Sequence, residues 1–319
     1  MRSRMDDSVL TPRLRAARRC DERALAELPW REAVLVLLDV YALHLAPIDE
    51  LRGAEEWQHH PRIAEIKQAL EPRFRSRLGG DVVVSTVGHV TGDVTGDVTE
   101  AFRAIAHEEL VPPVYAWLAD EADRSDLTEF LAFEGGPDAD FDDLVAACQI
   151  GLSGVPKVTL AANYWDEMGR GSLGNVHTEL HRQMADALRM RRIPAARLPL
   201  EALERKALNG YLATNRALQP EMLGSLGLLE CQAGPRCRRV VAAMDRLGVP
   251  AAARPFYAEH ASADPRHGKD WIEGAIAPTV HEHPSWGPRI LRGARWRATV
   301  NHNFFAVMAD RFGIGERAA

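Results

Sequence analysis

A short segment in the C-terminal third combines two histidines with a carboxylate at helical spacing. Within FYAEHASADPRHGKDW, the residues His260, Asp264 and His267 occupy positions i, i+4 and i+7. On a helix of about 3.6 residues per turn, these side chains share one face. Imidazole nitrogens and carboxylate oxygens suit iron(II) and manganese(II). The segment therefore predicts one wall of a metal site, although a solvated polar face would show the same spacing.

A second segment, NYWDEMGRGSLGNVHTELH, supplies Glu167 and His177. On one unbroken helix they would lie roughly 15 Å apart, at about 1.5 Å per residue, which is too far for both to bind one metal centre. Gly169, Gly171 and Gly174 stand between them, and glycine tolerates the backbone angles of a helix interruption. We expect a break here if both residues are ligands. The alternative is that each is an exposed residue at a helix end.

A third carboxylate, Glu230, ends the largely apolar run MLGSLGLLE. A carboxylate on an apolar helical face is costly to bury unless it is paired or bound to a metal. Glu230 is therefore a candidate ligand, and a position in water at the helix end is the equal alternative.

As a set, these residues resemble the haem-oxygenase-like diiron oxidases and oxygenases, also called iron-containing redox enzymes. Members of that family carry a Glu and a His from one core segment, a Glu on a later helix and a His-x3-Asp-x2-His set on a third. The segments NYWDEMGRG, HTELH and HGKDW also resemble sequences of the family. The resemblance as a whole covers roughly residues 108–312. The resemblance implies the metal ligands Glu167, His177, Glu230, His260, Asp264 and His267.

Some members of the family use a further carboxylate upstream. Glu134, in FLAFEGGPDADFDDL, is the nearest match, and Asp142 and Asp143 are the alternatives. A Glu134 at a helix end, before two glycines and without a metal, would fit the same sequence.

The resemblance implies two iron(II) ions per chain with O2 as co-substrate. We expect oxidation of a small amine or amino-acid-like metabolite, with N-oxygenation favoured and with no catalytic side chain beyond the metal ligands. A diiron oxidase that desaturates or decarboxylates fatty acids is the enzymatic alternative, and a non-enzymatic helical binding protein is the alternative from another class. A cofactor-free hydrolase on this fold would need a reactive cysteine, for which Cys148, Cys231 and Cys237 are present.

Several residues close to the ligands in sequence are candidates for contact with the substrate. Arg170 and Lys269 would suit a substrate carboxylate, although solvated surface is the simpler interpretation for both. The aromatic candidates, each of which would equally serve in core packing, are Tyr164, Trp165, Phe256, Tyr257 and Trp271.

Pro265 directly follows Asp264. Proline lacks the backbone donor and disfavours helical angles in the residue before it. We therefore expect a local distortion of this helix, and we predict that the iron bound by His260 and Asp264 is the more labile of the two.

Charge and composition narrow the classes of partner. The 319 residues carry 39 Lys and Arg against 45 Asp and Glu, a net charge of −6, so no global positive field attracts nucleic acid or anionic lipid. The most apolar stretch, residues 33–46, is interrupted by Asp39 and His44 and is shorter than a membrane span. We expect a small-molecule substrate and neither nucleic acid nor membrane as partner, and we allow for an external electron donor and a homodimer.

Cysteine content and the N-terminal sequence indicate the compartment. There are 4 cysteines against 12 histidines, and no CxxC pair occurs, so neither a disulfide framework nor a zinc knuckle is indicated. The N-terminal residues have no apolar segment of the secretory kind. We expect a cytoplasmic protein.

The elements that must position these residues are mostly helices. Apolar residues recur at helical spacing in about ten segments, and the resemblance implies an all-α, haem-oxygenase-like bundle of about seven core helices. Residues 81–99, DVVVSTVGHVTGDVTGDVT, are rich in β-branched residues and predict a short extended or β segment. We expect an N-terminal helical extension over residues 1–98 and a diiron domain over 99–319. The expected helical segments are 24–45, 62–70, 114–122, 127–133, 141–152, 158–166, 176–190, 199–217, 222–230, 236–247 and 300–312.

Overall fold

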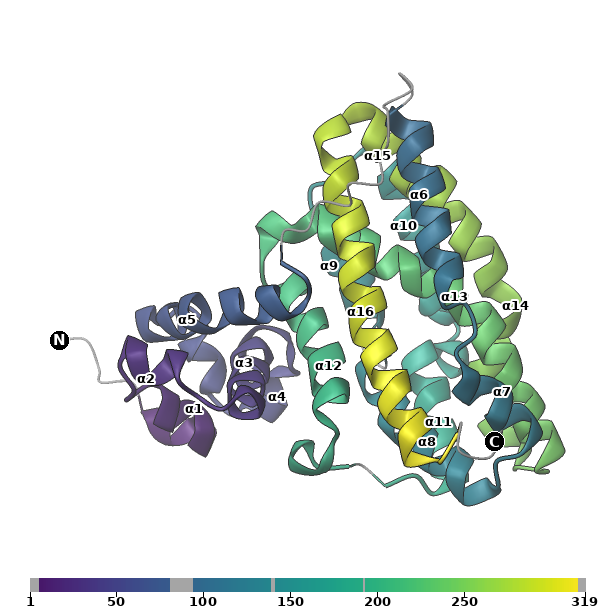
Figure 1. Cartoon of the computed structure of the whole chain (residues 1–319), viewed down its shortest axis with the longest axis horizontal. Coiled ribbons are helices and arrows are strands. Elements are labelled where there is room, and N and C mark those ends of the chain that lie inside the picture. Colours follow the sequence, from purple (N-terminus) through teal and green to yellow (C-terminus); the bar gives the residue numbers. More distant parts are fainter. Residues whose placement is uncertain (1–5, 81–93, 139–140, 192, 315–319) are drawn as a thin grey trace.

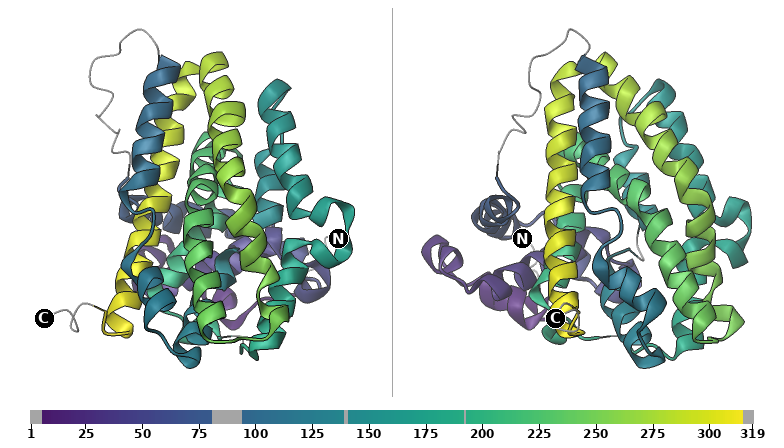
Figure 2. Two further views of the ribbon diagram at one scale, coloured as in Figure 1. Left: turned by 90° about the vertical axis from the view of Figure 1, so that its right-hand side faces the viewer. Right: turned by 45° about the vertical axis from the view of Figure 1, so that its right-hand side comes forward.

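A computed structural model describes residues 6–80, 94–138, 141–191 and 193–314, without the side chains of residues 136–138 and 263–265. All regular secondary structure in these ranges is helical, so the predicted all-α fold is confirmed. Figures 1 and 2 show long helices running lengthwise, with the N-terminal helices against one side. The extension holds α1 (Pro12–Ala17), α2 (Glu22–Ala26), α3 (Trp30–Leu45), α4 (Ile48–Leu51) and α5 (Pro61–Arg77). The bundle holds α6 (Val94–Glu108), α7 (Pro113–Asp120), α8 (Arg124–Asp138), α9 (Phe141–Cys148), α10 (Gly154–Glu167), α11 (His177–Leu188), α12 (Leu200–Ala213), α13 (Gln219–Arg246), α14 (Pro255–Asp270), α15 (Ala277–Glu282) and α16 (Gly287–Arg311).

Helix α13 is the central element of the bundle. It packs against α14, α16 and α7, and its run from Met222 to Leu228 is buried on every side. A helix that is buried all round belongs to the core. The two helices predicted at 222–230 and 236–247 are one helix of 28 residues that contains Pro235. Proline removes one backbone hydrogen bond, but packing along both halves keeps the helix continuous.

Helices α13 and α16 approach each other closely at two glycines. A Cβ atom on Gly224 would lie 1.9 Å from the carbonyl oxygen of Ile290, and one on Gly293 would lie 1.9 Å from that of Glu221. No side chain fits at either position. The contact therefore fixes α16 against α13, on which part of the metal centre is built.

The most apolar stretch of the sequence, residues 33–46, supplies most of α3. Ala33, Val34 and Leu37 are completely buried, while Asp39 pairs with Arg13 at 3.1 Å. Among the described residues, none of the helices combines the length and the apolar character that crossing a bilayer requires.

The N-terminal extension shares a core with the bundle. Helix α3 packs on α12, and Trp30 Nε1 donates a hydrogen bond of 2.6 Å to Glu204 of α12. Leu37 and Leu208 belong to one continuous apolar cluster. The division at residue 98 falls inside α6, where the chain has no break, and the two-domain description stays a prediction.

The predicted extended segment is wrong for residues 94–99, which form the first turns of α6. Residues 81–93 lie outside the described ranges. Val98, Phe102 and Ile105 are buried at helical spacing, and Asp97 in the first turn favours a helix N-terminus. Burial of this stripe outweighs the β preference of the valines and threonines.

Candidate metal centre

The chain breaks its helical course between α10 and α11. Glu167 is the last residue of α10 and His177 is the first residue of α11. Between them φ is 59° at Gly169, 53° at Arg170 and 84° at Gly171, a left-handed region that glycine adopts readily. His177 Nδ1 consequently lies 2.6 Å from Glu167 Oε2. The break predicted from the glycines is confirmed.

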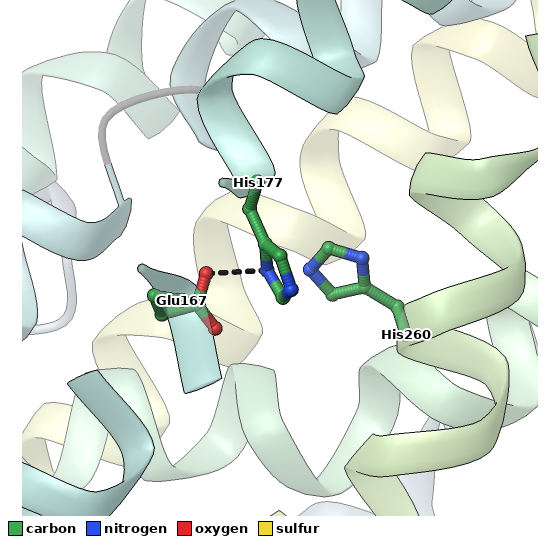
Figure 3. Close-up of side chains that lie close together, drawn as sticks. All are labelled: Glu167, His177 and His260. Atoms are coloured by element: carbon green, nitrogen blue, oxygen red, sulfur yellow. Dashed lines mark ion pairs between the residues drawn. The ribbon is translucent and has the colours of Figure 1, made fainter. Parts of the chain in front are cut away.

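Three predicted ligands form one compact group. One donor atom each from Glu167, His177 and His260 lies within 4.8 Å of the other two, and the side chains converge from α10, α11 and α14 (Figure 3). Glu167 is 3% and His177 5% exposed. Nδ1 of His260 lies 2.7 Å from the carbonyl oxygen of Phe256. When Nδ1 donates to this carbonyl, Nε2 is the nitrogen that remains for a metal.

Glu230 and His267 form a second group where α13 and α14 cross. His267 Nδ1 lies 3.5 Å from Glu230 Oε2, and both side chains are buried. The helices approach closely because Gly268 has no side chain: a Cβ there would lie 3.0 Å from the Cα of Cys231. Asn163 of α10 donates a 2.9 Å hydrogen bond to Glu230 Oε1.

Asp166 fixes the second histidine and was not among the predicted residues. Its Oδ2 lies 2.8 Å from His267 Nε2, which directs Nδ1 of the same ring toward Glu230. A carboxylate on the outer nitrogen of a histidine is a common support for a metal ligand. Burial opposes ionisation of Asp166, but hydrogen bonds from His267 and Arg170 outweigh it and keep the pKa of Asp166 below its usual value.

The two groups border one cavity of about 100 Å³, since Glu167, Glu230 and His260 all line it. Their donors are imidazole nitrogens and carboxylate oxygens that are largely removed from water. Such a donor set fits iron(II) and related first-row ions better than a soft, thiolate-binding metal. The residues present therefore fit iron.

Glu134 lies in the wall of this cavity and outside the group of three. Tyr115 donates a short hydrogen bond to its Oε1, and Tyr257 donates one of 3.2 Å to its Oε2. Burial, reinforced by the negative charge of Glu134, raises the pKa of both tyrosines well above the usual value. Both tyrosines are therefore protonated donors. Ligation by Glu134 stays a prediction, and its alternative Asp143 is exposed on α9.

Asp264 lies within α14, but its side chain is outside the part of the chain that the structure describes. Its role as a ligand stays a prediction. The same holds for the distortion at Pro265 and for the greater lability of one iron, although α14 is assigned as helix throughout Pro255–Asp270.

Some of the aromatic residues near the ligands line the cavity, and others do not. Phe256 and Tyr257 line the cavity. Trp271 is instead a buried core residue whose Nε1 donates to the carbonyl of Leu223, and Trp165 is 55% exposed. Tyr164 packs against the edge of the core.

The two basic residues proposed to meet a substrate carboxylate lie on the surface. Arg170 pairs with Asp166 and Glu259, and Lys269 lies 3.8 Å from Glu273. Neither of them belongs to the lining of the cavity described above. Ion pairs at the solvent-exposed surface explain the positions of both side chains.

Two arginines that were absent from the predicted site line the cavity instead. Arg205 of α12 is 1% exposed and Arg236 of α13 is 6% exposed. Burial lowers the pKa of Arg236 from its usual value. A signal for Arg236 exists in the sequence, because it follows Leu229 by two helical turns and so shares the face of an apolar residue.

Comparison with known proteins agrees with the geometry. The family model of the iron-containing redox enzymes matches residues 128–302, more than half of the 319 residues. This range contains all of the predicted ligands. No curated protein matches the chain. From the family match and the all-helical architecture, we conclude that the chain belongs to the haem-oxygenase-like family of iron-containing redox enzymes.

Proposed function

We propose that the protein is a non-haem oxidase or oxygenase that uses two iron(II) ions and O2 to oxidise a small amine or amino-acid-like metabolite. The observation that carries this proposal is the convergence of Glu167, His177 and His260, of which Glu167 and His260 line a small cavity. Membership of an iron-containing redox family supports the metal and the class of reaction.

In this proposal the two groups of side chains hold one iron each. Glu167, His177 and His260, with Asp264, hold the first, and Glu230 and His267 hold the second. Bound iron(II) would supply the activation of O2. The chain itself keeps the imidazole of His267 oriented through Asp166.

The cavity wall contributes binding and exclusion of water. Phe256 and Leu229 present apolar surface beside the metal groups, and the cavity is bordered by buried side chains. Side chains that keep water away from the metal groups limit the loss of a reactive oxidant to solvent.

N-oxygenation is the favoured outcome. It converts an amine R–NH2 and O2 to R–NHOH and water, with two electrons and two protons from an external reductant. One oxygen atom enters the new N–O bond and the other leaves as water. An external electron donor is therefore part of the proposal.

The size of the cavity favours a compact substrate over a fatty acid. The cavity of about 100 Å³ is small. We therefore place a small amino acid ahead of a long acyl chain as the substrate. Thiolate chemistry at Cys148 and Cys231 is disfavoured as well, because burial raises the pKa of both thiols to about 12.

Single-turnover oxidation tests the proposal. Protein loaded with iron(II) without air is mixed with O2 and with each of a panel of small amines and amino acids, and O2 uptake and hydroxylamine products are measured. We expect substrate-dependent O2 uptake in the wild type, its loss in His260→Ala and its retention in His283→Ala, since His283 is half exposed at a helix end. Equal O2 uptake by His260→Ala would refute the assigned site.

A further inference from the structure

The wall of the cavity carries two buried positive charges in addition to the metal groups. Arg205 comes from α12 and Arg236 from α13, and both line the space that Glu167 and Glu230 also border. Their side chains are almost completely removed from solvent. Each guanidinium stays charged in a protein, so both charges need partners.

The hydrogen bonds of Arg236 leave one edge of its guanidinium for a ligand. Nε donates 3.1 Å to the carbonyl of Leu110, and Nη2 donates to the carbonyl of Glu109 at 2.8 Å and to Gln232 Oε1 at 2.7 Å. From Nη1 there is no hydrogen bond to any described residue. A guanidinium has five N–H donors, so the two on Nη1 are available within the cavity wall.

Arg205 is fixed beside Arg236 by different contacts. Its Nε donates 3.1 Å to Asn301 Oδ1, and its guanidinium carbon lies 4.6 Å from the centre of the Phe304 ring. The amide and the aromatic ring help to orient the guanidinium. Arg205 thus contributes a second positive charge to the same part of the wall.

The carboxylates of the cavity wall are divided between the metal groups and this pair of arginines. Glu167 and Glu230 belong to the metal groups, which leaves Glu134 as the carboxylate of the wall that faces the arginines. Glu109 contributes its main-chain carbonyl to Arg236, while its side chain lies 3.2 Å from the exposed His302. When Glu167 and Glu230 bind iron, Glu134 is therefore the carboxylate of the described lining that remains opposite the two guanidiniums.

We propose that Arg236, assisted by Arg205, binds the carboxylate of the substrate, so that the substrate is a compact amino acid and not a simple amine. The N–H groups on Nη1 of Arg236 would donate charge-assisted hydrogen bonds to the oxygens of that carboxylate. That this anion belongs to the substrate of iron chemistry rests on the proposed function.

Matched acid and amide probes test this subsite. L-Alanine, L-valine and L-norvaline are each compared with their primary amides, which have the same number of non-hydrogen atoms but lack the negative charge. Calorimetry on the full-length protein, both iron-free and iron-loaded, gives the dissociation constants. We expect the acids to bind about tenfold or more tightly than the amides in both forms.

Two variants of α13 assign the preference to one residue. In Arg236→Gln we expect the acids to bind no more tightly than the amides. Arg239→Gln, an exposed position on the same helix, should keep the wild-type preference. Equal binding of acid and amide by the wild type, no binding of the acids, or an unchanged preference in Arg236→Gln would overturn the proposal. Even if Arg236→Gln does not fold, the comparison of acid and amide binding by the wild type still tests the proposal.

The iron-free measurement separates this inference from the proposed function. A protein that prefers acids in the iron-free form but binds no iron would overturn the proposed oxidase and leave the subsite standing. A protein that binds iron and consumes O2 but binds acid and amide equally tightly would overturn only the proposed carboxylate subsite.

Discussion

Asp166 shows how one side chain outside the metal groups shapes their geometry. Its carboxylate holds His267 Nε2 at 2.8 Å, and the same carboxylate is held by Arg170 at 2.6 Å. With its outer nitrogen engaged, the imidazole of His267 has one remaining nitrogen, and this nitrogen faces Glu230. Asp166 is thus a positioning residue.

Replacing this carboxylate should weaken one iron selectively. In Asp166→Asn we expect the affinity for the iron at Glu230 and His267 to fall about 10- to 100-fold, because the neutral amide orients the imidazole less strongly. Competition with a chelator under anaerobic conditions measures both iron affinities. Asp186→Asn, which alters a carboxylate on the surface, is the control and should leave both unchanged. An unchanged affinity in Asp166→Asn would contradict the positioning role.

The buried thiols should be almost inert to alkylation. Only the thiolate reacts, and with the pKa of Cys148 and Cys231 raised to about 12 by burial, about one molecule in ten thousand carries it at pH 8. We expect iodoacetamide to modify these residues more than a thousandfold faster in urea, where the pKa returns to about 8.5. Mass spectrometry after timed quenching measures each site. Rapid modification of Cys231 in the folded protein would revive a cysteine-based mechanism.

At the scale of single residues, the sequence identifies candidate metal ligands better than the residues that orient them. The convergence of Glu167, His177 and His260 was predictable through the resemblance, which groups a Glu and a His of one segment with a His of a later helix. The partner of His267 was not, since Asp166 lies 101 residues earlier in the chain. Arg236 was missed for a similar reason, because an arginine at an apolar position becomes informative only when the cavity beside it is known.

The break between α10 and α11 is the element that assembles the first metal group. It converts two residues ten positions apart into neighbours at 2.6 Å. Gly169 is the position with the least freedom: its φ is 59°, and a Cβ there would lie 2.5 Å from the main-chain carbon of Asn175.

A methyl group at this position should damage the site. In Gly169→Ala we expect a loss of about 1–2 kcal/mol from the left-handed backbone alone, with more from the clash, and a fall in iron content. Gly174→Ala is a matched control in the same connection, because a Cβ there meets nothing within 4 Å. Chemical denaturation and iron analysis of both variants check this. Equal behaviour of the two variants would show that the break does not depend on Gly169.

Elements were predictable where local pattern and packing agree. The buried α3 and the interruption after Glu167 follow from composition and from glycine. The first turns of α6 could not be predicted in this way. Valines such as Val98 favour a strand locally, whereas the burial of Val98 beside Phe102 and Ile105 requires a helix. Pro235 similarly indicates a break that the packing of α13 overrides.

On the scale of the whole molecule, the extension and the bundle form one apolar core. Leu37 of α3 is completely buried in the cluster that also contains Leu208 of α12 and Trp296 of α16. The buried Glu204 of α12 is paired with both Trp30 and Arg77 of the extension. Separation of the two parts would expose apolar surface on each and leave this carboxylate without its partners.

Unfolding should therefore be a single cooperative transition. We expect urea curves from far-ultraviolet circular dichroism and from tryptophan fluorescence to coincide. Leu37→Ala should destabilise the whole chain by about 2–5 kcal/mol. Leu173→Ala, which is 81% exposed, should have almost no effect. Two separate transitions, with Leu37→Ala shifting only one, would show instead that the extension is an independent domain.

We propose that histidines and carboxylates from α10, α11, α13 and α14 hold two iron ions. The most direct test of this proposal is an anaerobic iron(II) titration of the full-length protein, with bound iron counted after removal of the excess. The account predicts two iron ions per chain in the wild type and in His283→Ala, and fewer in Glu167→Ala and His260→Ala. A wild-type chain that binds no iron, or a His260→Ala variant that binds the full two, would contradict it.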